Sequence, residues 1–147
     1  MSQRFVYRPL NAERMANIGQ TVIDTVVKPR IAQAVNVSDQ PAKPLKPGRV
    51  VNGRQLKGYP EYKIARGRAP IRDLFWRGMT MRSMRVVDAT ANKVRIGFDN
   101  PQASRIAAIN QRREPMFWFS PADQLKIGEI VRAELSQAEL VQIVRVA

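Results

Sequence analysis

The feature that most restricts the fold is a stretch in the first half of the chain, residues 36–70, in which apolar periodicity disappears. Prolines and glycines alternate along it, namely Pro41, Pro44, Pro47, Pro60 and Pro70 with Gly48, Gly53, Gly58 and Gly67. Because proline removes a backbone donor and glycine adds conformational freedom, this composition disfavours long regular elements. We therefore expect a long loop or arm, and a structureless connection of this length inside a compact domain is usually functional.

This stretch, called the arm below, is also the most positive part of a basic chain. The 147 residues carry 25 lysines and arginines against 12 acids, a net charge of +13 that would attract nucleic acid, anionic surfaces or acidic proteins. Glu61 is the single acid among eight basic residues, which are Lys43, Lys46, Arg49, Arg54, Lys57, Lys63, Arg66 and Arg68. Two interpretations stay open, a solvated and partly disordered loop or a segment that orders against a partner chain or nucleic acid. The aromatic rings of Tyr59 and Tyr62 favour the second.

The residues before the arm predict a helix. Asn11 can cap a helix over residues 12–35, whose apolar positions recur at a spacing of three to four residues. Pro29 lies inside this pattern, so we expect either a kink near Val26 or a second short helix after it. Of the two, the kink is favoured.

The residues after the arm predict a β-hairpin followed by a helix. Residues 84–90 are rich in β-branched side chains, and residues 93–98 alternate, with Val94, Ile96 and Phe98 on one face. Residues 90–92 form the turn between them. Asn100 and Pro101 are typical of a helix cap and a first helical position. They predict a helix that ends at about residue 112, with Ile106 and Ile109 facing inward.

The stretch MFWFSPAD, residues 116–123, predicts a junction between a strand and a helix. Three aromatic residues in a row would cover both faces of a sheet, and Ser120, Pro121 and Asp123 are typical of a helix start. Trp118 is either a core residue, an exposed anchor at a subunit interface, or a stacking surface for a ligand. The helix would present Leu125, Gly128, Val131 and Leu135 on one face, with Ile127 and Ile130 beside it. Residues 140–146 fit a final strand or a second short helix.

Together these patterns predict a single α+β domain over residues 1–147. It would contain an N-terminal helix, an antiparallel sheet with a central β-hairpin, a C-terminal helix packed on the sheet, and the long basic arm.

Several kinds of chemistry are excluded by composition. The chain has no cysteine and no histidine, which removes disulfides, thiolate nucleophiles, zinc sites of the usual kind and imidazole bases. The acids are scattered, no glycine-rich phosphate loop can be written, and Ser-x-x-Lys does not occur. No window reaches the roughly 18 apolar residues of a membrane span. We expect a soluble protein that is not an enzyme and uses no cofactor or metal.

Short motifs follow one another in a recognisable order between residues 42 and 131. They are Pro44-Leu45, Tyr59 to Lys63, Arg77-Gly78-Met79 with Ser83, Val94 to Gly97, and Phe117 to Asp123. In their order and spacing the chain resembles the tail-completion and virion morphogenesis proteins of tailed bacteriophages.

The resemblance implies a structural virion protein, made in the host cytoplasm, whose subunits form a ring at the head–tail joint or upper tail. Portal, connector or tail proteins are the implied partners, with DNA in the lumen as a second counterpart, and neither a membrane nor a small-molecule substrate. Ring subunits often lay an arm on their neighbour. The candidate interface residues are Lys43, Lys46, Arg49, Arg54, Lys57, Tyr59, Tyr62, Lys63, Arg66, Arg68 and Trp118. Two alternatives remain, a basic nucleic-acid-binding module and a minor capsid or decoration protein.

Overall fold

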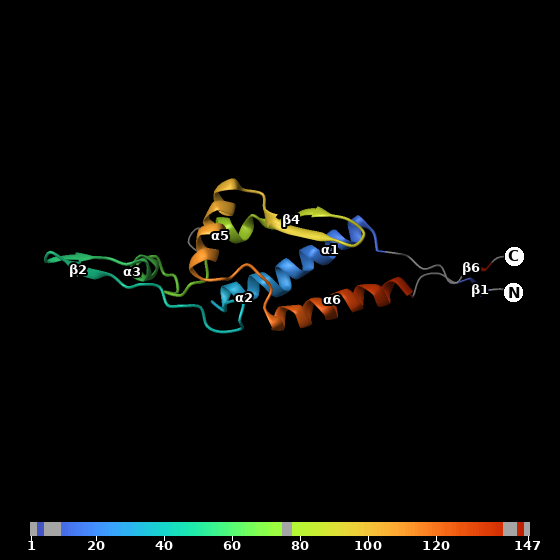
Figure 1. Cartoon of the computed structure of the whole chain (residues 1–147), viewed down its shortest axis with the longest axis horizontal. Helices are drawn as coiled ribbons and strands as arrows, with labels where there is room; N and C mark the ends of the chain where they lie inside the picture. The colour runs from blue at the N-terminus through green and yellow to red at the C-terminus, as the bar shows by residue number, and fades with distance from the viewer. Residues whose placement is uncertain (1–2, 5–9, 75–77, 140–143, 146–147) are drawn as a thin grey trace.

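Helices and strands alternate irregularly in the computed structural model, which describes residues 3–4, 10–74, 78–139 and 144–145. In chain order the elements are β1 (Gln3–Arg4), α1 (Ala12–Val22), the π-helical segment η1 (Ile23–Val27), α2 (Lys28–Ala32), β2 (Arg49–Val51), β3 (Arg54–Leu56), α3 (Tyr59–Ile64), α4 (Met79–Arg82), β4 (Met84–Ala89), β5 (Val94–Phe98), α5 (Pro101–Arg113), α6 (Pro121–Glu139) and β6 (Val144–Arg145) (Figure 1). The α+β class is as expected. The described strands form three separate antiparallel pairs, β1–β6, β2–β3 and β4–β5, instead of one sheet.

The N-terminal helix runs through Pro29 without a break. The side chain of Asn11 accepts a hydrogen bond from the Arg14 amide at 2.8 Å, which caps α1 as predicted. The turns of η1 are wider than those of an α-helix and lie just before Pro29. This width gives room to the proline ring, which would otherwise clash with the carbonyl of Thr25. The helical run ends at Ala32, earlier than expected, because the backbone reverses at Ala34 with a φ of 54°.

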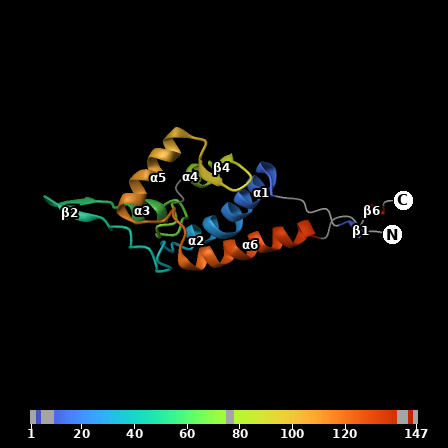
Figure 2. The ribbon, with the colours of Figure 1, turned by 45° about the vertical axis from the view of Figure 1, so that its right-hand side comes forward.

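The core is built around α1. The β4–β5 hairpin lies on one side of this helix and α6 on the other, in both ribbon views (Figures 1 and 2). The C-terminal helix therefore packs on α1 and η1, where we had expected it on the sheet. The buried cluster consists of Ile18, Val22, Ile23, Val26, Val27, Ile31, Met84 and Met116.

Close contact between α1 and the hairpin depends on one glycine. A Cβ atom at Gly19 would stand 2.5 Å from Cγ1 of Val94 and 2.7 Å from Cγ2 of Val86. Both distances are far below van der Waals contact, so only glycine lets the helix approach the strands this closely.

The hairpin itself is confirmed, with Met84 opposite Phe98 and Ala89 opposite Val94. A bulge at Val87 shifts the register, so that Asp88 is exposed like Val87 and the alternation resumes with Ala89 half-buried.

Two expected inward faces are only partly confirmed. In α5 the buried residues are Ala103 and Ala107, whereas Ile106 is half-buried and Ile109 is exposed. In α6 the expected Val131 packs against the core together with Ile127 and Ile130, but Leu125 is exposed. Which stripe of these helices is buried depends on where α1 and β5 lie, and the local pattern does not contain that information. The expected final element falls largely outside the described residues, which include only β6 of it.

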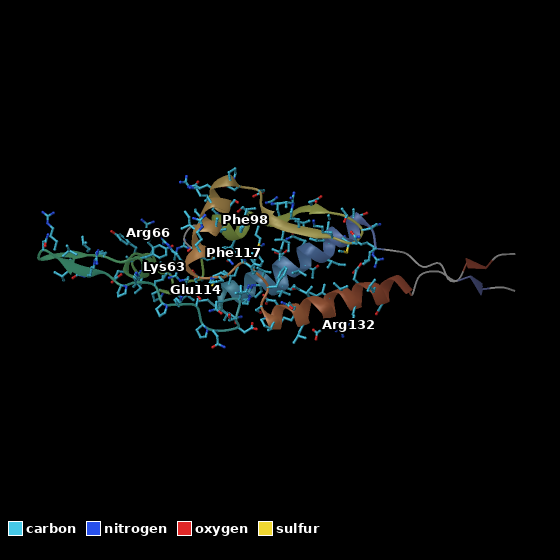
Figure 3. The ribbon with its side chains drawn as sticks, in the orientation of Figure 1. Lys63, Arg66, Phe98, Glu114, Phe117 and Arg132 are labelled. Atoms are coloured by element: carbon cyan, nitrogen blue, oxygen red, sulfur yellow. The ribbon has the colours of Figure 1, made fainter. Side chains whose placement is uncertain are left out.

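Residues 116–119 do not form the expected strand. The backbone carbonyls of Met116 and Trp118 accept hydrogen bonds from Nη2 of Arg30, each at 2.8 Å, instead of pairing with a neighbouring strand. Phe117 is half-buried and packs edge-to-face with Phe98, with ring centroids 5.4 Å apart. Both residues are labelled in Figure 3. The predicted helix start is confirmed, since α6 begins at Pro121.

Candidate subunit interface

The arm contains regular structure, which corrects the expectation of a structureless loop. Strands β2 and β3 form an antiparallel hairpin in which Arg49 faces Leu56 and Val51 faces Arg54. The turn residues Asn52 and Gly53 have φ angles of 49° and 72°. Two successive positive φ angles are typical of the tight turns that match the twist of a hairpin, and Asn-Gly is the dipeptide that favours them most. This dipeptide was the sequence signal for the hairpin.

Helix α3 holds the base of the hairpin. Oε1 of Glu61 accepts a hydrogen bond from the Gly48 amide at 2.7 Å, and this bond lowers the pKa of the Glu61 carboxyl. Gly48 and Gly58 also lie so close together that a side chain at either position would overlap the backbone at the other. The two ends of the hairpin are therefore fixed side by side.

Lys63 is the one candidate interface residue that the structure buries. Its side chain is 1% exposed, and its ammonium forms an ion pair with Asp73 and donates to the carbonyl of Ile71 at 2.7 Å. The ammonium also lies 6.0 Å from the ring centroid of Tyr59, whose pKa is raised by burial and by Asp73. Lys63 thus organises the arm from within and does not offer its charge to a partner. Figure 3 shows it between the hairpin and the body.

The other candidates on the arm lie at or near its surface. Arg68 is half-buried, and the exposed ones are Lys43, Lys46, Arg49, Arg54, Lys57, Tyr59, Tyr62 and Arg66. Between them lie exposed apolar residues that sequence reasoning missed, Val50, Val51, Leu56 and Ile64. All six residues of β2 and β3 are exposed, so the hairpin has no buried face.

The hairpin projects away from the body, at the end opposite β1 and β6 (Figure 1). Each of its strands pairs only with the other in the described structure, which leaves an unpaired edge on both. A two-stranded hairpin with neither a covered face nor a covered edge is marginally stable in water.

Trp118 is exposed, and belongs to the body instead of the arm. Its side chain is 70% exposed, which contradicts the interpretation of Trp118 as a core residue. The backbone beneath it is held rigidly, because Arg30 binds the Trp118 carbonyl and forms a buried ion pair with Asp123 at 2.7 Å. Because its backbone is already fixed, binding through this ring would cost no further backbone entropy, and tryptophan is a residue type that often anchors interfaces.

The start of α6 is fixed by further bonds to the same region. The Ser120 amide donates to the Asp123 carboxylate and the Asp123 amide donates to the Ser120 hydroxyl, each at 3.1 Å. Asp39 accepts from the Ala122 amide at 3.0 Å, and hydrogen bonds from Ser120 and Ala122 lower the pKa of Asp39.

The described residues contain no group of three acidic side chains placed to hold a metal ion. Within the same residues, no helix combines the length and apolarity needed to span a membrane. Comparisons with protein-family models, with curated proteins and with solved structures found no match for the chain.

Proposed function

We propose that this protein is a structural subunit of a tailed-phage virion and forms a homo-oligomeric ring at the head–tail joint or upper tail. The observation that supports this most is the hairpin of the arm. It projects from the body with all six strand residues exposed, and it mixes basic with apolar side chains.

Contact with a neighbouring subunit would stabilise such an exposed hairpin. Burying Val50 and Leu56 would remove apolar surface from water, worth about 25 cal/mol for each Å² covered. The unpaired edges could add a strand to a neighbour's sheet, where backbone hydrogen bonds contribute affinity. A contact in which one subunit's arm lies on a different surface of the next subunit is head-to-tail, and head-to-tail contacts generate rings when the rotation closes.

The positive charge of the arm favours an acidic partner. Arg49, Arg54 and Lys57 are exposed around the hairpin, so an acidic surface on a portal, connector or tail protein would complement it and increase the association rate. Trp118 would provide a second anchor from the body. In this proposal the protein acts by assembly in the virion and catalyses no reaction.

Native mass measurement together with electron microscopy of the purified protein tests the proposal. We expect closed rings, and we expect them to disappear when residues 49–56 are replaced by a short Gly-Ser linker. Because Gly48 and Gly58 already lie side by side, this excision leaves the body joined without strain. Circular dichroism and the urea midpoint of the body are the controls. A monomer at every concentration that also fails to bind portal or tail proteins would contradict the proposal.

The net charge of +13 favours nucleic-acid binding as the second candidate. A monomer whose DNA affinity falls steeply with salt would support it, since each phosphate contact releases counterions.

A further inference from the structure

A groove of about 1110 Å³ lies between the base of the arm and α5, and its lining includes three of the candidate interface residues, Lys43, Lys46 and Tyr59. One wall is formed by residues 43–46 with Tyr59, and the other by α4 and one side of α5. Residues 71, 72 and 74 also line it. Pockets for drug-sized molecules span about 300–1,000 Å³, so this groove is large enough for several residues of a peptide.

Every charged side chain among the described lining residues is basic. These side chains are Lys43, Lys46, Arg72 and Arg113. Arg72 is fixed in place because its Nε donates to the carbonyl of Lys43 at 3.1 Å. Lys43 approaches the buried Glu114 at 3.9 Å, but its own side chain remains 78% exposed. The groove therefore attracts carboxylates, and its arginines can bind them with two parallel hydrogen bonds.

The uncharged lining residues that the structure describes are mainly aliphatic. Leu45, Ile71, Leu74, Met79 and Ile106 supply apolar surface, and Tyr59 is the only aromatic among the lining residues that the structure describes. These aliphatic side chains fit the apolar side chains of a peptide, and Thr80, Gln102 and Asn110 can bond its backbone.

We infer that this groove binds an acidic peptide segment carrying spaced apolar side chains, supplied by a partner protein. A second copy of this chain is a poor donor, because it has only 12 acids. Six of them already lie in ion pairs within the subunit, namely Asp24, Asp73, Asp99, Glu114, Asp123 and Glu134. The inference does not depend on ring formation.

Neighbouring residues of α5 provide matched variants for the test. Arg113 lines the groove and Arg112 does not, although both are exposed. Likewise Ile106 lines the groove and Ile109 does not. The probe is a short fluorescein-labelled peptide of alternating Glu and Leu, with binding followed by anisotropy at fixed salt on the full-length chain.

We expect Arg113→Glu to weaken binding on the order of tenfold, the loss of about 1.4 kcal/mol, and Arg112→Glu to weaken it less than about threefold. Ile106→Ser should weaken binding more than Ile109→Ser, and a Glu–Ser peptide should bind more weakly than the Glu–Leu peptide. Urea midpoints confirm that each variant is folded.

Absence of peptide binding would overturn the inference. Equal effects of Arg113→Glu and Arg112→Glu would also overturn it, because they would mean that the peptide is attracted to the overall charge of the protein and not to the groove. An oligothymidylate that binds more tightly and competes with the peptide would assign the groove to nucleic acid. If the peptide instead dissolved the protein's own oligomers, the occupant would be a second copy.

Discussion

Replacing Arg30 with methionine tests whether the buried guanidinium holds the body together. Arg30 is 8% exposed and bonds to Asp123 as well as to three backbone carbonyls, those of Val35, Met116 and Trp118. Methionine would fill much of the same volume but would leave the Asp123 carboxylate buried without its cation. Breaking a buried pair in this way costs about 3–5 kcal/mol.

The expected change is large enough to measure directly. With a urea m-value of about 2 kcal/mol/M, a loss of about 4 kcal/mol lowers the midpoint by about 2 M. Urea is preferable to guanidinium chloride because it does not screen charge. The matched control is Lys28→Met on the same helical run, where Lys28 pairs with Asp24 near the surface at 2.7 Å. Exposed pairs four residues apart contribute about 0.3–0.5 kcal/mol.

A double variant separates the buried charge from the lost packing. Arg30→Met with Asp123→Asn removes both charges, so it should be more stable than Arg30→Met alone. The reasoning would be refuted if Arg30→Met destabilised the protein no more than Lys28→Met, or if adding Asp123→Asn reduced the stability further.

Three more changes address the arm and the candidate interface. Gly53→Ala places a Cβ in open space but at a φ of 72°, which costs about 1 kcal/mol of backbone strain. Amide exchange in residues 49–56 should therefore become faster, while the urea midpoint of the body stays the same. Unchanged exchange rates would argue against this turn. The bond from Gly48 lowers the pKa of Glu61, so its stabilisation is present above the ordinary carboxyl pKa and is lost as pH falls through the lowered value. The amide proton of Gly48 should therefore lose protection in acid, and Glu61→Gln should abolish that pH dependence. Trp118→Ala should change the free energy of unfolding by less than about 0.5 kcal/mol while weakening assembly, and a strongly destabilised monomer would show that the ring supports the core.

Local patterns predicted the elements whose causes are local. The hairpin of residues 84–98 follows from alternation, and the caps at Asn11, Asn100 and Ser120 follow from side chains that bond amides two or three residues away. The hairpin of the arm has a local signal as well, Asn52-Gly53, but the prolines and glycines around this dipeptide are equally typical of an irregular loop.

The exposure of the basic residues of the arm could be predicted from the sequence only in part. Most basic residues of the arm lie at its surface, as a solvated charge prefers, yet Lys63 is buried because Asp73 and the carbonyl of Ile71 meet its ammonium. The expected strand at residues 116–119 failed for a similar reason, since Arg30 lies far away in sequence and binds the carbonyls that a strand would have used.

By itself, the sequence determined the N-terminal helix, the hairpin of residues 84–98, the two helices that follow it, the strong positive charge and the absence of thiol and imidazole chemistry. The tertiary structure alone decided which helix faces are buried, that Arg30 and Lys63 serve as internal cations, and that Lys43, Arg72 and Arg113 line one groove. The physical reason is the separation along the chain between the residues that interact. Capping, turn formation and alternation involve neighbours along the chain, whereas burial and the pairing of charges depend on which distant segments the fold brings together.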